Sequence, residues 1–250
     1  MQAIVSDIHS NLEAMTTVLA DIKGRGITDI ICLGDIVGYG PNPKECVDRA
    51  AAFKLSLLGN HEEAVLFEVH AQGFNPRASS AVRWTNKQFD MLCEDREANA
   101  KRWDFMGGMV RNYTANGVLL VHGSPPDNTR EYVYTTDVRN PSKMARIFAS
   151  VEHLCFVGHT HTPGVWTEDL TYRSPEELDF EYAITDKKTI INVGSVGQPR
   201  DNDPRACYAT FDGSVVRWIK IPYDVEKTVA KIYAIDGLDN TLGDRLREGR

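Results

Sequence analysis

The chain of 250 residues has no long apolar run, no closely paired cysteines and no excess of basic residues. No stretch reaches the roughly 18 apolar residues that a transmembrane helix needs, and the first six residues resemble a strand rather than a basic and then apolar leader. The formal net charge of −7 argues against a broad nucleic-acid-binding surface but leaves room for a local cationic pocket. We therefore expect a cytoplasmic protein without membrane association.

The five cysteines are odd in number and far apart, and none forms a Cys-x-x-Cys pair. Several lie inside apolar runs, which predicts buried free thiols in a reducing compartment. These residues are Cys32, Cys46, Cys93, Cys155 and Cys207. With 42% hydrophobic and 25% charged residues, the composition is that of an ordinary globular protein. Its length allows a large core in one domain, residues 1–250, and nothing in the sequence specifies an oligomeric state.

Strand-like and helix-like segments alternate at the start of the chain. Residues 3–6 form a short apolar run, residues 12–24 have helical spacing, and residues 28–33 form a second apolar run, which together predict a βαβ unit. A further helix is expected over residues 43–52 and a third strand over 55–58. This alternation is typical of a parallel, doubly wound α/β sheet.

The alternation stops after the third strand. Residues 63–107 read as a helical insert that caps the site, with residues 78–93 as its clearest helix. A hairpin follows, because Asn116-Gly117 joins two strand-like segments, and residues 124–140 form a polar loop. The second half is rich in short strands. A helix over residues 224–235 and a frayed, charged tail over residues 244–250 are expected at the end.

Polar side chains follow five of the apolar runs. They are Asp7 and His9, Asp35, Asn60 and His61, His122, and His159 and His161. Because ligands of open α/β sheets bind at the carboxyl ends of strands, we expect these groups to meet at one sheet edge. Carboxylates, imidazoles and an amide oxygen suit Mn, Fe, Zn or Co better than calcium. Eight groups are too many for one ion, whereas two ions roughly 3.5–4 Å apart that share a carboxylate would use nearly all of them.

Each of these motifs is weak when taken alone. Gly34-Asp35 usually marks a turn, and a lone histidine such as His122 is more often packed than coordinating. His70 and His153 do not follow a strand into a glycine-rich loop, and we assign them no role. By contrast, the eight polar groups occur together at five strand ends, which favours a metal site. In an extended chain, His159 and His161 would point to the same side and could approach adjacent ions.

Five motifs in this order resemble the calcineurin-like metallophosphoesterases. They are Asp7-Ile8-His9, Gly34-Asp35-Ile36-Val37-Gly38, Gly59-Asn60-His61-Glu62, Val121-His122-Gly123 and Gly158-His159-Thr160-His161. The resemblance spans residues 3–200 and is greatest to a small bacterial branch related to dinucleoside tetraphosphatases and serine/threonine protein phosphatases. The stretches Gly38-Tyr39-Gly40-Pro41-Asn42-Pro43 and Asn192-Val193-Gly194-Ser195-Val196-Gly197-Gln198-Pro199-Arg200 are typical of that branch.

The resemblance implies a four-layer α/β/β/α sandwich, with the later strands as a second sheet. It also implies a ligand set: Asp7, His9 and His161 for one ion, Asn60, His122 and His159 for a second, and Asp35 as the bridge. The ions would be two of Mn, Fe, Zn, Ni, Co or Mg, with Mn expected to work in vitro. A bridging hydroxide would attack phosphorus in line, and His61 would act as general acid.

The implied activity is hydrolysis of a phosphomonoester, a nucleotide polyphosphate or a phosphodiester, so the partner would be a phosphorylated small molecule, a nucleotide or a phosphoprotein. A non-catalytic metal-binding scaffold of the same fold is the alternative, and the presence of His61 with all seven ligand positions disfavours it. Protein phosphatases of this family carry an Arg-Gly pair where this chain has Gly38-Tyr39-Gly40, which weakens a direct assignment to them.

Two further residues are candidates for binding substrate. Arg200 could clamp a phosphate, or it could form a salt bridge with Asp201 or Asp203. Asn11 could contact substrate, although capping the following helix fits it better. Other candidates that could line the site from the loops and the insert are Tyr39, Phe74, Arg77, Arg130 and Tyr132.

Overall fold

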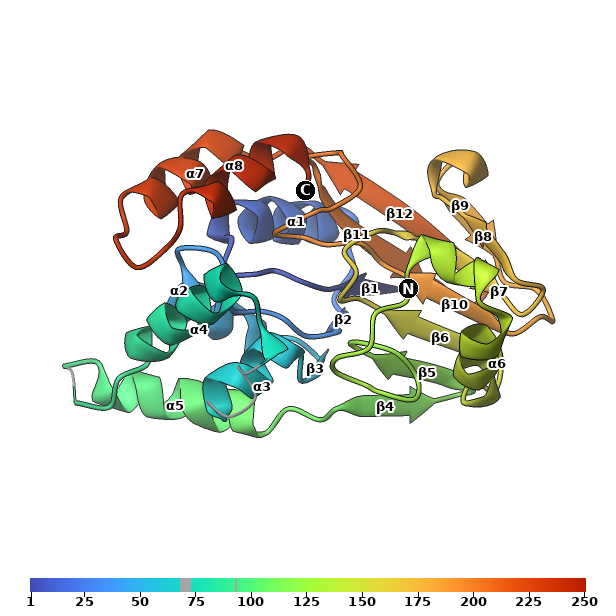
Figure 1. The fold of residues 1–250 in the computed structure, drawn as a ribbon, viewed down its shortest axis with the longest axis horizontal. Coiled ribbons are helices and arrows are strands. Elements are labelled where there is room, and N and C mark those ends of the chain that lie inside the picture. Colours follow the sequence, from blue (N-terminus) through green and yellow to red (C-terminus); the bar gives the residue numbers. More distant parts are fainter. Residues whose placement is uncertain (68–72, 93) are drawn as a thin grey trace.

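Two six-stranded mixed sheets face each other in the computed structural model, which describes residues 1–67, 73–92 and 94–250 (Figure 1). The first sheet consists, in order, of β3 (Leu55–Ser56), β2 (Ile30–Cys32), β1 (Gln2–Val5), β11 (Ala206–Phe211), β12 (Val215–Ile221) and β9 (Glu181–Ala183). The second consists of β4 (Asn112–Ala115), β5 (Val118–Val121), β6 (Leu154–Val157), β10 (Thr189–Asn192), β7 (Gly164–Thr167) and β8 (Thr171–Arg173).

The predicted parallel strands are present, but they do not extend into a doubly wound sheet. Strands β1, β2 and β3 are parallel, and so are β5, β6 and β10. On its other side β1 pairs antiparallel with β11, a strand from the end of the chain. The alternation of strand and helix therefore predicts only the first three strands, because long-range pairing completes each sheet.

Helices cover the outer faces of the sandwich. The helices are α1 (Leu12–Gly24), α2 (Pro43–Ala50), α3 (Asn60–Leu66), α4 (Pro76–Gln88), α5 (Arg96–Gly107), α6 (Pro141–Ala149), α7 (Val225–Tyr233) and α8 (Thr241–Glu248). Among the described residues, the 3-10 turns Thr135–Arg139 and Glu176–Leu178 lie in the loops. Helix α6 packs on the second sheet, and α1 and α2 pack on the first.

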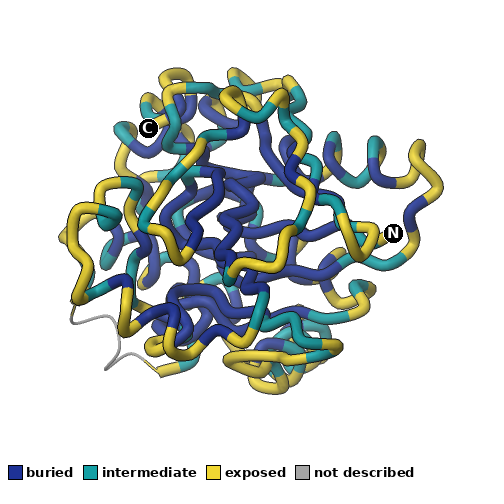
Figure 2. The backbone as a smooth tube through the Cα atoms, turned by 90° about the vertical axis from the view of Figure 1, so that its right-hand side faces the viewer, coloured by how far each residue is buried: buried dark blue, intermediate teal, exposed yellow. Residues whose placement is uncertain are grey.

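Alternating side chains of the buried strands fill three apolar layers. In β1, Ile4 lies between the sheets and Val5 faces the helices of the first sheet. In β6, Phe156 lies between the sheets and Cys155 faces α6. Successive strand residues point to opposite faces, and here both are buried, so both faces of each sheet are covered. The central strands are accordingly dark in Figure 2. The four-layer α/β/β/α sandwich is confirmed.

The end of the chain is helical, whereas a frayed tail was predicted. Residues 241–248 form α8, which packs on α7 with Leu242 and Leu246 buried, while Arg247 pairs with Glu226 and Asp244 on the outer side. The high charge of this segment hides the four-residue spacing of its two leucines.

Two smaller predictions have different outcomes. The helix expected over residues 78–93 ends at Gln88 and is therefore shorter than predicted. The four described cysteines are buried and free, as predicted. Cys93 and His70 lie outside the described residues. Among the described residues, no helix is long and apolar enough to cross a membrane.

Candidate metal centre

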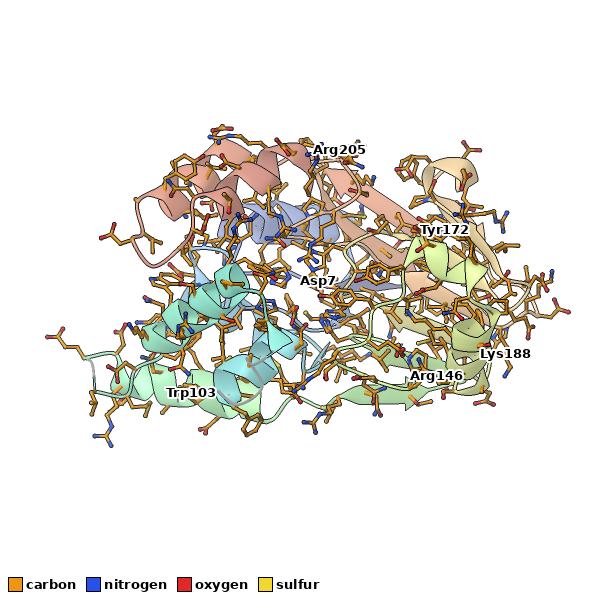
Figure 3. All side chains as sticks on the ribbon, in the orientation of Figure 1. Asp7, Trp103, Arg146, Tyr172, Lys188 and Arg205 are labelled. Carbon is orange, nitrogen blue, oxygen red and sulfur yellow. The ribbon has the colours of Figure 1, made fainter. Side chains whose placement is uncertain are left out.

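The predicted ligands gather where the two sheets meet, and not at the edge of one sheet as expected. Asp7 and His9 follow β1, Asp35 follows β2, Asn60 and His61 follow β3, His122 follows β5, and His159 and His161 follow β6. Strands β1 to β3 belong to one sheet, and β5 and β6 belong to the other. Asn60 and His61 also begin helix α3, where a loop was expected. Figure 3 shows Asp7 near the middle of the molecule.

Asp7, His9 and His161 form the first cluster, with one candidate ligand atom of each within 4.8 Å of the others. The two Nε2 atoms of His9 and His161 are 3.1 Å apart, and His161 Nε2 is 3.0 Å from Asp7 Oδ1. All three side chains are at most 1% exposed. A carboxylate and two imidazoles therefore converge on one point that bulk water does not reach.

The second cluster contains Asp35, Asn60, His122 and His159. His122 Nε2 is 3.1 Å from His159 Nδ1, 3.1 Å from Asn60 Oδ1 and 3.3 Å from Asp35 Oδ2. The same Asp35 oxygen is 3.7 Å from His9 Nε2 of the first cluster. One carboxylate oxygen thus lies between the two clusters, where a bridging ligand would lie.

The outer ring nitrogen of each clustered histidine faces a backbone carbonyl. The pairs are His9 Nδ1 with Val37 O at 3.1 Å, His161 Nδ1 with Gln198 O at 2.5 Å, His122 Nδ1 with Leu33 O at 3.1 Å, and His159 Nε2 with Arg130 O at 3.0 Å. A nitrogen that faces a carbonyl carries the proton, so the inward nitrogen of a neutral ring presents a lone pair.

This arrangement fits metal ions. Inward lone pairs only 3.1 Å apart repel each other unless a cation or a proton lies between them. Ligand atoms bound about 2.1 Å from one ion are about 3.0–3.4 Å apart, close to the spacing within each cluster. Burial disfavours a proton on His122, but Asp35 outweighs it and raises the pKa of His122 to about 9. Without an ion, a proton therefore occupies part of this site.

Five of the seven predicted ligands have left-handed backbone conformations, with φ between 47° and 61°. They are Asp7, His9, Asp35, His159 and His161. Each such residue costs on the order of 1–3 kcal/mol, so the surrounding fold must hold it in place. His159 and His161 do reach adjacent clusters, but through this strained loop rather than through the extended chain that was predicted.

Glu62 is a buried residue of the site that sequence reasoning missed. Its carboxylate accepts hydrogen bonds from the backbone N–H groups of Asp35, Val37 and Gly59 at 2.8, 2.9 and 3.0 Å. It therefore ties the loop of Asp35 to the start of α3. Burial and Asp35 raise its pKa to about 7, which the N–H donors oppose. The sequence signal was its position three residues after Gly59, as in a capping box.

Aromatic rings surround His61. Its ring centre is 4.5 Å from that of Tyr39, 4.8 Å from that of His9 and 4.9 Å from that of Phe74. Its Nδ1 is buried and has no hydrogen-bond partner among the described residues. Tyr132 stacks on His159 at 3.8 Å.

The two remaining lining candidates, both arginines, have carboxylate partners. Arg77 pairs with Asp239, and Arg130 pairs with Glu63. The aromatic candidates therefore touch the clustered histidines directly, whereas these arginines are engaged in ion pairs.

Arg200 lies beside the clusters and does not pair with Asp201 or Asp203. Its guanidinium donates to Gln198 Oε1 at 2.8 Å and lies 6.0 Å from the ring centre of Tyr39. The two aspartates pair with Lys220 instead. The ion-pair alternative for Arg200 is therefore absent from the described part of the chain.

Asn11 caps helix α1, as the alternative reading of this residue proposed. It accepts from Ala14 N at 3.1 Å and donates to Gly197 O at 2.9 Å and to Tyr223 Oη at 3.0 Å. Its amide thus fixes the loop of Gly197 against α1, and a contact with substrate stays a prediction.

Known proteins resemble this chain in sequence and in fold. A model of the calcineurin-like phosphoesterase superfamily domain matches residues 1–214. An uncharacterised protein of Methanocaldococcus jannaschii is 38% identical over 258 residues, covering 100% of this chain and 98% of its own length. The crystal structure of a metallophosphoesterase from Sphaerobacter thermophilus has 35% identity and a TM-score of 0.83, covering 100% of this chain and 98% of its own. A hypothetical protein of Pyrococcus horikoshii shares the fold, with a TM-score of 0.75 and 16% identity, covering 100% of this chain and 99% of its own.

Proposed function

Because the chain belongs to the calcineurin-like phosphoesterase superfamily and is a metal-dependent phosphoesterase, we propose that it works with two divalent ions. Asp7, His9 and His161 would hold the first ion, and Asn60, His122 and His159 the second, with Asp35 shared between them. The observation that carries this proposal is the position of Asp35 Oδ2, 3.7 Å from His9 Nε2 and 3.3 Å from His122 Nε2. Manganese is the ion that we expect to support activity in vitro.

Attack on an anionic phosphorus requires neutralising charge and an acidified water, and two bound ions would supply both. The chain's own contribution is rigidity. Glu62 fixes the Asp35 loop, and the carbonyls that face the four imidazoles fix the direction of each ring. Such prior placement means that the ligands need no rearrangement during the reaction.

His61 is proposed as the proton donor to the leaving oxygen. Asp35 Oδ1 accepts from its backbone N–H at 2.9 Å, which places the imidazole next to the proposed bridge without using a ring nitrogen. Burial lowers the pKa of His61 to about 4, with Asp35 opposing. A phosphate dianion beside the ring would add negative charge and raise that pKa toward the working range.

Arg200 and the aromatic rim would bind the rest of the substrate. The buried Nε of Arg200 has no hydrogen-bond partner among the described residues, and a phosphate oxygen that reached it would supply one. Phe74, from the segment proposed as a cap over residues 63–107, stacks on His61 and would limit access of water. We propose a phosphomonoester, a nucleotide polyphosphate or a phosphodiester as substrate, carried by a small molecule, a nucleotide or a phosphoprotein.

A substrate panel on metal-loaded protein tests this proposal. Nitrophenyl phosphate and its bis-ester distinguish monoesterase from diesterase activity, and phosphopeptides, dinucleoside polyphosphates and cyclic nucleotides define the substrate class. Asp35→Asn is the matched variant, because it keeps the shape of the side chain and removes the shared charge. We expect metal-dependent turnover that Asp35→Asn abolishes. Turnover that is equal in Asp35→Asn would contradict the proposed bridge.

A further inference from the structure

The loop after β5 holds the imidazole of His159 from outside. The Nε2 atom of His159 faces the carbonyl oxygen of Arg130 at 3.0 Å, and the ring of Tyr132 stacks on the imidazole with ring centres 3.8 Å apart. Residues 130–132 belong to no helix or strand. The orientation of this candidate ligand therefore depends on how the rest of the fold fixes these three residues.

The carbonyls behind two other clustered histidines have evident supports. His122 faces the carbonyl of Leu33, which directly follows β2. His9 faces the carbonyl of Val37, and the N–H group of Val37 donates to the buried carboxylate of Glu62. A ligand of this kind keeps its direction only when the group behind it is itself held in place. The carbonyl behind His159 needs such a support as well.

The side chain of Arg130 supplies this support by tying the loop to helix α3. Its Nε and Nη2 both donate to Oε2 of Glu63, at 3.0 and 2.7 Å. Glu63 is only 3% exposed, and its other oxygen, Oε1, accepts from Arg111 Nη2 at 2.8 Å. Hydrogen bonds between ionised groups are stronger than neutral ones, and two donors from one planar guanidinium also fix its direction. Glu63 thus determines where Arg130 lies.

Helix α3 carries a candidate ligand of the same cluster. Asn60 and Glu63 are three residues apart in this helix, so their side chains lie on the same side of it. Asn60 Oδ1 is 3.1 Å from His122 Nε2, which is 3.1 Å from His159 Nδ1. One turn of helix therefore bears a ligand of the second cluster and the anchor of the loop that orients another.

We propose that Glu63 is a positioning residue for the second cluster. Through Arg130 it holds the carbonyl that orients His159, and it thereby sets the metal affinity of the second cluster but not that of the first. The histidines of the first cluster face carbonyls of two other loops, those of Val37 and Gln198, so loss of this anchor should leave them in place. The inference rests on the two-ion function proposed above.

Calorimetric titration of the metal-free, full-length protein with manganese tests this role without turnover. His159→Asn and His161→Asn first identify which binding event belongs to the second cluster and which to the first. We expect Glu63→Gln and Arg130→Gln each to weaken the second-cluster event about tenfold to a hundredfold, and the first by less than about threefold, as for loss of a group behind a metal ligand. Arg130→Lys keeps the charge and should restore part of the affinity.

Arg111→Gln is the matched control. It removes the other guanidinium from the same carboxylate and leaves the pair of Glu63 and Arg130 intact, so both events should stay within about threefold of wild type. A purely structural loss would weaken both events alike. An unchanged second-cluster event in Glu63→Gln and Arg130→Gln, or an equal loss in Arg111→Gln, would overturn the inference.

Two other outcomes are also decisive. Should Glu63→Gln fail to fold, Arg130→Gln decides, because the side chain of Arg130 is half exposed and its removal leaves no cavity in the core. Wild-type protein that binds only one manganese ion would refute the two-ion function. The inference then stands if Arg130→Gln weakens that single event as His159→Asn does, and falls if only His159→Asn weakens it.

Discussion

Replacing Glu62 by glutamine tests whether this carboxylate holds the metal-binding loops together. The amide oxygen of glutamine can accept the bonds from Asp35 N and Gly59 N, but its NH2 group must then face Val37 N–H. One charge-assisted hydrogen bond is lost, at about 1.5–3 kcal/mol, and one buried donor is left unpaired, at about 1–3 kcal/mol. These costs sum to about 3–5 kcal/mol, but burial and Asp35 disfavour the ionised carboxylate, as its raised pKa shows, and the neutral amide relieves part of that cost. We therefore expect a net loss of about 1–3 kcal/mol, which lowers the melting temperature of a chain of this size by about 2–12 °C.

Differential scanning calorimetry on chelator-treated protein at pH 8.5 measures this loss, because Glu62 is ionised there and altered metal affinity does not contribute. Glu45→Gln is the control. Its exposed carboxylate accepts one side-chain bond from Asn42, and its replacement should change stability by less than about 0.5 kcal/mol. A melting temperature within 2 °C of wild type corresponds to a loss of roughly 1 kcal/mol or less. Such a result for Glu62→Gln would refute the role assigned to the carboxylate.

Three further predictions concern the site. His61→Asn should retain metal and lower kcat on an alkyl phosphate about 10²–10⁴-fold. The loss should be smaller on nitrophenyl phosphate, whose leaving group needs no proton. An unchanged rate on the alkyl ester argues against a proton donor. Because Asp35 raises the pKa of His122 to about 9, metal binding at pH 7.5 should release about one proton from His122. The released proton makes the calorimetric heat of binding depend on the ionisation heat of the buffer. Equal heats in all buffers would contradict this prediction. Arg200→Gln should raise KM for a phosphomonoester about tenfold to a hundredfold with a smaller change in kcat, and an unaltered KM in steady-state assays excludes phosphate binding by this residue.

The clustering of the candidate ligands was predictable because each lies within a few residues of the end of a strand. Asp7 comes two residues after β1, and His122 comes directly after β5, so local patterning places both at strand ends. Local patterning does not say which sheet a strand joins. That β5 belongs to a second sheet depends on pairing between distant segments, which the residues alone did not indicate. The family resemblance implied a second sheet, but one made of the later strands.

What the sequence did not indicate depends on contacts between distant residues. The role of Glu62 comes from backbone groups 25 and 27 residues away along the chain, and a glutamate at the start of a helix usually suggests only a cap. The last helix was mistaken for a tail because its charged residues outnumber its leucines. Its buried face packs against α7, against Ala81 and Trp84 of α4, and against Tyr39, all of them distant in sequence or on another element.

Titrating metal-free protein with manganese while following nitrophenyl phosphate hydrolysis tests the central claim most directly. Two clusters that share Asp35 predict turnover that rises until two equivalents of manganese are bound per chain, with little activity at one. Full activity at one equivalent would contradict the shared carboxylate between two ions. The absence of turnover with Mn, Fe, Ni, Co, Zn and Mg alike would contradict the proposed hydrolase itself.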